Sequence, residues 1–544
     1  GGRVKIYHRQ ANFSVAISTA GGIKGAIAGA GTSEGDPAAE AGSIGAVSFG
    51  IMASSPTSLA FPAVFATSIT WSWTAAPAWG DAAEASRKYR LYSDTVSYRT
   101  LDRSPQLTVS SDTVSTTETG LAPNTTYTRY ATAFTDYSDS LPSNAVSTHT
   151  LASVPGSAVS AFTAVTTASL SLNWSAGSPA NPGYTKYEVN RSTDINFGIN
   201  VSTSYIAALS SATVGLTPNT TYHFRVRAIN LDNLPTSFTP ILSTATLAAA
   251  PAGPSFAEVN STSFTFNWSA NGNPPLTRYI AELSTDNFAT LAQSSITLNT
   301  SAAFTGLTIN ALYYARSRAQ NHNGLDTAFT AAVSTITDAV QPLNAALPFI
   351  NLSANALTLN WESGGNSAGT DYNPWISTSS DFSAPVSSAV TTGLNYDFKG
   401  LLANTTYYAR IRAIGRDGTP ASYAGSVSTV TLTLSPVTAS PPFTGVFADS
   451  FTFNWENGGN PDGTRYTAEI SKDGFVSVSS AIQATALSAA FSSLAANTVY
   501  QARVKAANFL GVDGPYSSPI VSTATVVSAP VNAAAPFSNL SAGG

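Results

Sequence analysis

The sequence predicts an all-β protein, a tandem array of antiparallel β-sandwiches preceded by a small β-rich segment. Three observations lead to this prediction. A ten-residue stretch with a Tyr at its fourth position occurs five times, a Trp recurs at nearly the same period, and hydrophobic residues alternate with polar ones around both. The shared tyrosines follow one another at steps of 95, 91, 94 and 93 residues. A period this steady indicates a string of equivalent domains.

The repeated stretch reads NTTYYARIRA from Asn404 to Ala413, and its copies begin at Asn124, Asn219, Asn310 and Asn497. Inward residues alternate with outward ones along it, which is the period of a half-buried strand. The five tyrosines are expected in the cores, and they are Tyr127, Tyr222, Tyr313, Tyr407 and Tyr500.

The second landmark is a Trp upstream of each stretch, in strands such as Phe264 to Trp268. Short alternating strands separated by turn signals, at this repeat length, predict antiparallel sandwiches. The five tryptophans are also expected in the cores, and they are Trp73, Trp174, Trp268, Trp361 and Trp455.

The stretch from Leu216 to Asn230, with its Pro-Asn-Thr-Thr-Tyr and alternating Arg residues, resembles the fibronectin type III signature. The resemblance covers roughly residues 55–531. It implies that each Trp packs in the core from the second strand, and that each Tyr begins the sixth strand and hydrogen-bonds back to the preceding corner. The first domain departs from the pattern, because Arg129 occupies an inward position and Tyr130 and Thr132 replace the basic pair.

Proline-marked linkers between the repeats predict stiff, extended joints, and five domains in line would reach on the order of 150 Å at about 3.3 Å per strand residue. The end of the sequence suggests another repeat, since Ala535 to Ser541 resembles Leu347 to Ser353. We therefore expect the natural protein to be longer. The predicted segments are 1–54 (non-repeat Gly/Ala-rich β segment), 55–152, 153–250, 251–342, 343–437 and 438–531 (domains 1 to 5), and 532–544 (first strand of a sixth repeat).

Residues 1–54 do not match the repeat. Val4 and Ile6, then Phe13 to Ile17, suggest two strands, and Ala46 to Met52 suggests another. The Gly/Ala-rich stretch from Gly21 to Gly45 contains too many glycines for a helix. Two interpretations stay open for the segment: a small β cap or leader, and a strand-donating or docking element.

Composition excludes several function classes. Charged residues make up 10% of the chain and the net charge is −5, so neither nucleic acid nor an anionic membrane is an implied partner. There is no Cys, which excludes disulfides and thiolate metal sites. No 18-residue apolar run exists, so we expect no membrane span.

We find no catalytic pattern in the sequence. The four His residues fall in different segments, and no carboxylate pair faces one cleft within a domain. Four Asp residues recur in Ser-Thr-Asp-type turns, each followed closely by a Phe, and a structural turn is favoured over calcium binding. They are Asp194, Asp286, Asp381 and Asp473. The sequence therefore predicts no enzyme, cofactor or metal.

Paired basic residues form an outward stripe, for which cross-strand pairing with acids such as Glu282 and Glu469 is favoured over polyanion binding. In domain 4, Trp375 aligns with those acids, on the outward face, where it stacks on Arg410 or Arg412 or marks a partner surface. These three residues are the candidate interface. Sequons such as Asn404-Thr-Thr406 make glycosylation a further option.

The sequence predicts a non-enzymatic, extracellular or cell-surface structural protein of bacterial type, a subunit of a filament, sheath or stalk. Low charge and scarce Lys on sheet edges predict self-association into a polymer, with glycans as a further candidate partner. Two alternatives stay open: an adhesin or carbohydrate-binding array, and the accessory region of a secreted enzyme whose catalytic domain lies outside this chain.

Overall fold

The computed structural model describes residues 4–8, 47–80, 82–93, 105–135 and 138–531. It confirms the predicted all-β class: in these ranges the only helix is the three-residue 3-10 helix η1, Glu84–Ser86. The chain divides into two compact units, one of which comprises Gly1–Ala249, Gly272–Thr277 and Gln320–Thr327, and the other the remainder. No helix in the described ranges is long and apolar enough to span a membrane.

The N-terminal segment contributes two strands, β1 (Val4–His8) and β2 (Val47–Ile51), which pair in parallel. They match two of the three strands that the sequence predicts before residue 55. The third, around Phe13 to Ile17, and the Gly/Ala-rich stretch lie outside the described residues, as does the 532–544 segment.

Domain 1 is formed by two sheets, one with strand order β3-β4-β7 and the other with order β10-β8-β5-β6, where β9 also pairs with β8. Its strands are β3 (Thr57–Val64), β4 (Ser68–Thr74), β5 (Lys88–Tyr92), β6 (Leu107–Ser110), β7 (Ser115–Thr119), β8 (Thr126–Thr135), β9 (Ser138–Asp139) and β10 (Val146–His149).

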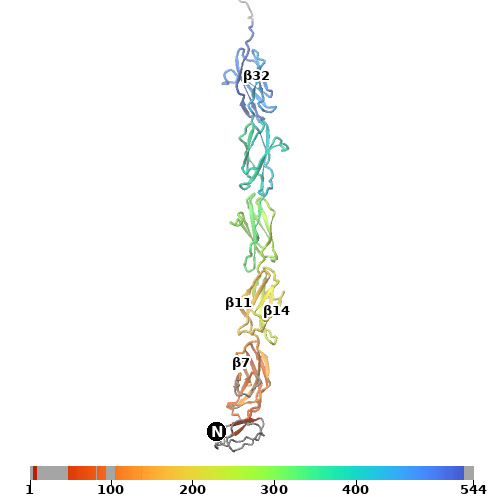
Figure 1. Cartoon of the computed structure of the whole chain (residues 1–544), viewed down its shortest axis with the longest axis vertical. Helices are drawn as coiled ribbons and strands as arrows, with labels where there is room; N and C mark the ends of the chain where they lie inside the picture. Colours follow the sequence, from red (N-terminus) through yellow and green to blue (C-terminus); the bar gives the residue numbers. More distant parts are fainter. Residues whose placement is uncertain (1–3, 9–46, 81, 94–104, 136–137, 532–544) are drawn as a thin grey trace, which may run out of the picture. The chain divides into compact units, whose positions relative to one another are not determined.

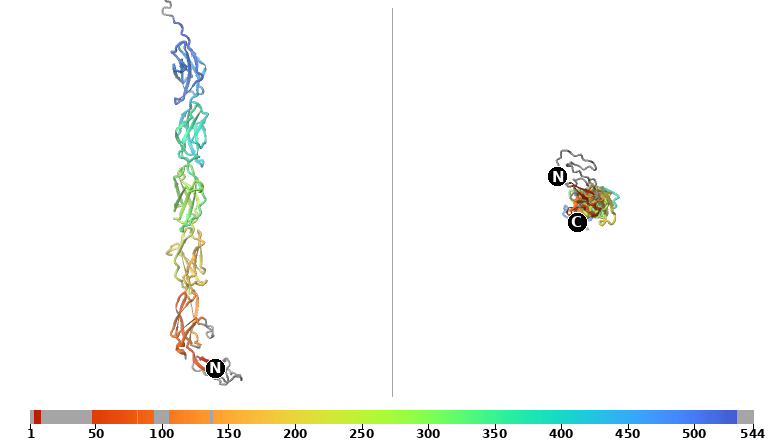
Figure 2. Two further views of the ribbon diagram at one scale, coloured as in Figure 1. Left: turned by 90° about the vertical axis from the view of Figure 1, so that its left-hand side faces the viewer. Right: turned by 90° about the horizontal axis from the view of Figure 1, so that it is seen from below.

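Domain 2 shows the arrangement that domains 3 and 4 repeat: a three-stranded sheet, β11-β12-β15, and a four-stranded sheet, β14-β13-β16-β17. Labels β11 and β14 in Figure 1 mark one strand of each sheet, and the left view of Figure 2 shows the same domain, in yellow-orange, from another side. Its strands are β11 (Gly156–Thr163), β12 (Ser169–Ser175), β13 (Lys186–Ser192), β14 (Ser202–Ile206), β15 (Ser210–Val214), β16 (Thr221–Ile229) and β17 (Leu242–Ala245).

Domain 3 has sheets β18-β19-β22 and β21-β20-β23-β24, and domain 4 has sheets β25-β26-β29 and β28-β27-β30-β31. The strands of domain 3 are β18 (Ala252–Ala257), β19 (Ser263–Ser269), β20 (Arg278–Ser284), β21 (Gln293–Thr297), β22 (Ser301–Thr305), β23 (Leu312–Gln320) and β24 (Val333–Ile336). Those of domain 4 are β25 (Leu343–Ile350), β26 (Ala356–Glu362), β27 (Asp371–Ser377), β28 (Pro385–Ser388), β29 (Asn395–Lys399), β30 (Thr406–Ile414) and β31 (Val427–Val430).

Domain 5 has the sheets β32-β33-β36 and β35-β34-β37-β38, with β39 also paired to β37. Its strands are β32 (Val437–Thr444), β33 (Phe451–Glu456), β34 (Arg465–Ser471), β35 (Ser480–Ala484), β36 (Ser488–Phe491), β37 (Val499–Ala507), β38 (Asp513–Tyr516) and β39 (Val521–Ala524).

The longest strand of each domain carries the repeated ten-residue stretch, and its alternation decides which side chains fill the core. Along β30 every second residue is buried, so that Tyr407, Ala409, Ile411 and Ala413 face the core. The landmark tryptophan packs beside them, with the Trp361 ring 5.8 Å from that of Tyr372. Equivalent Trp–Tyr contacts at 5.3–5.7 Å hold the other four cores.

In domain 1, Arg129 faces the core, as the alternation along β8 requires, although the residue is charged. Its guanidinium is buried, with Nη2 2.6 Å from the Glu118 carboxylate, and the Trp71 indole donates to the same carboxylate at 2.9 Å. A buried cation needs a paired and hydrogen-bonded anion. Glu118, on β7 in the opposite sheet, supplies it.

Candidate functional site

The most regular polar feature of the molecule is an asparagine at the corner before each long strand. These corner asparagines are Asn124, Asn219, Asn310, Asn404 and Asn497, and all five have φ between 41° and 53°. Asparagine tolerates this left-handed conformation better than most residues. Three residues later the landmark tyrosine closes the corner, as when Tyr407 Oη accepts from the Leu402 N–H at 2.9 Å.

Within the second unit, the corner asparagine of one domain is hydrogen-bonded to the next domain along the chain. Asn310 donates from Nδ2 to Thr370 Oγ1 at 2.9 Å and accepts the N–H of Arg416 at 2.8 Å on Oδ1. Asn404 does the same with Thr464 Oγ1, at 2.8 Å, and the N–H of Phe509, at 2.8 Å. Both side-chain functions of the amide are thereby satisfied across the joint.

The first unit contains the same contacts. Asn124 of domain 1 donates to Thr185 of domain 2 at 2.9 Å and accepts the Leu231 N–H at 2.8 Å. Asn219 donates to Thr277 at 2.9 Å and accepts the N–H of His322 at 2.8 Å. All four amides are buried, with at most 1% of their surface exposed.

Three of the four receiving threonines are positioned by their own loops. The hydroxyls of Thr277, Thr370 and Thr464 donate to the carbonyl three residues earlier at 2.6–2.7 Å. Since the hydroxyl proton is already used, the oxygen faces the corner asparagine as an acceptor. The hydrogen bond across the joint therefore has one direction, from the amide of the corner asparagine to the hydroxyl oxygen of the receiving threonine. We call this contact the polar lock.

A second asparagine in the same loop holds the linker. In domain 5, Asn460 accepts the Leu434 N–H at 2.8 Å and donates to the Leu434 carbonyl at 2.9 Å, so its amide pairs with the linker backbone as another strand would. Asn181, Asn273 and Asn366 make the same two bonds with Ser153, Ala249 and Val340.

Sequence reasoning missed these residues, although a signal for them exists. The pattern Asn-x-x-x-Thr-x-Tyr occurs at 181–187, 273–279, 366–372 and 460–466, at the same place in four domains. Its tyrosine is the partner of the landmark tryptophan in the core, and its two polar residues form the joint.

A comparison with protein-family models finds the fibronectin type III domain at residues 155–239 and 249–336. The chain therefore contains tandem fibronectin type III domains.

One curated relative is Endoglucanase B from Cellulomonas fimi, 27% identical over 317 residues, which cover 54% of this chain and 28% of that enzyme. The chain thus matches a little over a quarter of that relative's length. Similar solved structures include the FN1–FN3 domains of chicken CNTN1, at 16% identity, TM-score 0.22, 53% of this chain and 99% of that one. A two-domain segment of chicken tenascin matches at 13% identity, TM-score 0.26, 34% of this chain and 100% of that one.

The predicted core residues of the five domains lie as follows. All five landmark tryptophans are buried, as are Tyr222, Tyr313, Tyr407 and Tyr500, while Tyr127 is half-buried. Each of the five tyrosine hydroxyls accepts a backbone N–H five residues upstream at 2.8–3.0 Å. This is the corner bond that the family resemblance implies.

The outward basic residues lie between aromatic rings. Arg316 has the rings of Phe288 and Phe329 at 3.9 and 4.0 Å, and Arg503 has those of Phe475 and Tyr516 at 3.9 and 3.8 Å. Both also pair with the acids expected from the sequence: Arg316 lies 2.7 Å from Glu282, and Arg503 lies 2.7 Å from Glu469.

In domain 4 the candidate interface residues lie on one outward face. Trp375 is half-buried and cross-strand from Arg410, whose guanidinium lies 5.1 Å from its ring and 3.9 Å from that of Tyr423. Arg412 lies 4.8 Å from Tyr423 and donates to Asn373 at 3.2 Å. Trp375 thus takes the position that Glu282 and Glu469 have in domains 3 and 5.

The recurring Asp turns hold one ring of each aromatic pair. Asp473 accepts from Ser471, Ser477 and the Ser477 N–H, and these bonds lower the pKa of its carboxyl to about 2. The same kind of contact lowers the pKa of Asp286 and of Asp381 to about 2, and backbone N–H bonds lower the pKa of Asp194. The carboxylates are thus occupied by their own turns, and each turn places its Phe against an Arg.

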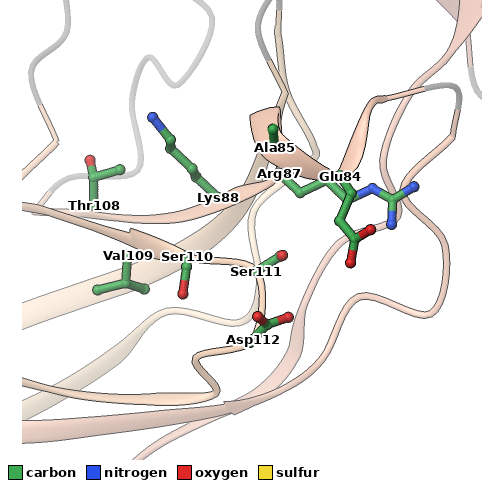
Figure 3. Close-up of a pocket in the computed structure, with 9 residues that line it drawn as sticks. All are labelled: Glu84, Ala85, Arg87, Lys88, Thr108, Val109, Ser110, Ser111 and Asp112. Carbon is green, nitrogen blue, oxygen red and sulfur yellow. The ribbon is translucent and has the colours of Figure 1, made fainter.

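A pocket in domain 1 is lined by residues of η1, β5, β6 and the turn after β6, among them Glu84, Lys88 and Asp112. Figure 3 shows that Lys88 extends away from Glu84 and Asp112, so the three charged groups do not converge on one point. The pocket therefore offers no assembled acid–base pair.

Proposed function

We propose that this protein is a non-enzymatic structural element of the bacterial cell surface, a stalk, sheath or filament subunit in which each joint holds one geometry. The observation that carries the proposal is the buried corner asparagine, bonded to both a side chain and a backbone group of the next domain. A tether that only had to connect its ends would not need such a bond.

The energetics support a stiff joint. Each buried hydrogen bond contributes about 0.5–1.5 kcal/mol, and leaving its partner unpaired costs about 1–3 kcal/mol. Opening the joint of domains 3 and 4 separates Asn310 from both Thr370 and Arg416, and the linker clamp between Asn366 and Val340 adds two more bonds. Bending at the joint is therefore costly.

The joint can be tested with spin labels, because the chain contains no cysteine of its own. Labels at Leu291→Cys and Val390→Cys, both exposed, report the distance between domains 3 and 4. We expect a narrow distance distribution that Asn310→Ala broadens. Asn497→Ala is the matched control, since it removes an asparagine with the same left-handed φ but an exposed side chain. A distribution that is already broad in the native chain would overturn the stiff-joint proposal.

Association between copies completes the proposal. The edge strands β14, β21, β28 and β35 read STSYI, QSSIT, PVSS and SAIQA and contain no charged residue. Charges on edges normally prevent sheets from pairing with other chains. We expect light scattering of the purified chain to show assemblies that grow with concentration. Thr203→Lys and Ser295→Lys, on two of these edges, should reduce the size of these assemblies. A stable monomer at high concentration would exclude the filament and sheath and retain the stalk.

The similarity to Endoglucanase B favours a second candidate, the accessory region of a secreted glycosidase. In that case the array would space or position a catalytic domain on a polysaccharide. A pull-down of the chain on insoluble cellulose separates the two candidates. Retention on cellulose that soluble glucan competes away would support the accessory role, and an unretained chain favours the structural one.

A further inference from the structure

The corner of domain 5 has the same backbone as the four corners that are engaged in joints. Asn497 has φ 51°, its N–H donates to the Val526 carbonyl at 3.2 Å, and the Thr498 N–H donates to Thr525 Oγ1 at 3.0 Å. Asn404 makes the corresponding bond to Leu432 at 3.1 Å, and Thr405 that to Thr431 at 3.0 Å. The donor half of a joint is therefore fully formed at this end of domain 5.

What differs is the environment of the side chain. Asn497 is exposed, and none of the described residues hydrogen-bonds to its amide, whereas its four counterparts are buried. The apolar surface beside it is exposed as well. Val527 is 68% exposed, although the residues at the same place in domains 1, 2 and 4, Ala152, Ala248 and Thr433, are at most 6% exposed.

We infer that Asn497, Val526 and Val527 form a docking surface for one more fibronectin type III domain of the receiving type. Such a domain carries a threonine two residues before the tyrosine of its third strand and a free backbone N–H in the turn after its long strand. These two groups complement the two functions of the Asn497 amide, and the loop around them covers the valines. The inference depends on the joint geometry and not on the proposed structural role.

The first domain of a second copy matches this surface less well than a domain of the receiving type. At the position of the receiving threonine, two residues before Tyr89, domain 1 has Arg87, and its guanidinium donates to the Ala82 carbonyl at 3.0 and 3.1 Å. The hydroxyl of this loop belongs to Ser86, one residue earlier than the receiving threonine, and it donates to the Ala83 carbonyl at 2.9 Å. The receiving threonines of domains 2 to 5 are already bonded.

The test compares the native chain with an extended one, in which residues 531–544 are replaced by a second copy of residues 437–531. That copy brings Thr464 and Phe509 as the receiving pair. Val527→Cys is introduced in both chains and its reaction with a maleimide is timed. We expect at least tenfold slower labelling in the extended chain. Two variants should restore most of the labelling rate: Asn497→Ala in the original domain 5, and Thr464→Val in the added copy. Val476→Cys, exposed elsewhere in domain 5, should react equally in both.

Two results would overturn the inference. One is equal labelling of Val527→Cys in the native and extended chains, with the added domain shown to be folded by its own melting transition. The other is protection in the native chain that increases with its concentration, which would assign the surface to a second copy.

Discussion

Nδ2 of Asn310 lies 2.9 Å from Oγ1 of Thr370, sixty residues further along the chain and in the next domain. The hydroxyl proton of Thr370 is bonded to the Ser367 carbonyl at 2.7 Å, so this contact has one direction only. The same relationship recurs at three other corner asparagines and indicates that the domains are joined by a repeated polar lock.

The first prediction concerns the acceptor of that lock. Thr464→Val keeps the shape of the side chain but removes the acceptor of the buried Asn404 Nδ2 and the hydroxyl bond to the Pro461 carbonyl. We expect the free energy of unfolding of domain 5 to fall by about 1–3 kcal/mol. Calorimetry of the full chain would measure this, with Thr464→Ser, which retains the hydroxyl, as the control. An unchanged melting profile for the valine variant would show that the polar lock does not contribute to the free energy of unfolding of domain 5.

The landmark residues of domain 4 lead to a second prediction. Trp361→Ala or Tyr407→Ala removes a large buried ring, and we expect domain 4 to lose about 3–5 kcal/mol. The other domains should change little, since repeat arrays are coupled mainly to neighbours. Tyr407→Phe separates packing from the bond to the Leu402 N–H and should cost about 1 kcal/mol. A thermal scan in which Tyr407→Ala leaves every transition in place would contradict the core assignment.

A third prediction tests the buried ion pair of domain 1. Glu118→Gln removes the anion that neutralises Arg129, and breaking such a buried pair costs about 3–5 kcal/mol. Replacing both residues, as Glu118→Leu with Arg129→Met, should destabilise domain 1 less than the single change does, because no uncompensated charge remains. Urea unfolding monitored by Trp fluorescence compares the two variants. The opposite order would mean that the pair itself stabilises the core.

The Asp turns give a prediction about pH. In the folded chain the pKa of Asp473 is about 2, below the ordinary value of about 3.9, because Ser471, Ser477 and a backbone N–H bond to its ionised form. A depressed pKa stabilises the fold fully above about pH 4, and this contribution is lost as the pH falls through about 2. An NMR titration of the Asp473 carboxyl carbon should give a midpoint near 2. A midpoint near 4 would show that the turn does not form in solution.

The sequence by itself determined the fold class and the tandem repeat. Alternation along Asn404 to Ala413 is a local, periodic property, and a strand with one buried face must place Tyr407 and Ile411 inward whatever surrounds it. The recurrence of Trp and Tyr then identified the family resemblance that residues 155–239 and 249–336 confirm. The pairing of Arg316 with Glu282 could also be predicted from the sequence, because the register of strands in a sandwich follows from the same alternation.

Only the tertiary structure decided the joints and the exceptions. Asn404 and Thr464 are sixty residues apart in different domains, and no local period relates a hydrogen-bond donor to an acceptor at that distance. Arg129 likewise appeared to break its strand until the fold placed Glu118 beside it. The physical reason is the same in both cases. Burial along a strand is set by its own alternation, whereas a buried polar group is satisfied by whichever partner the packed chain brings within about 3 Å.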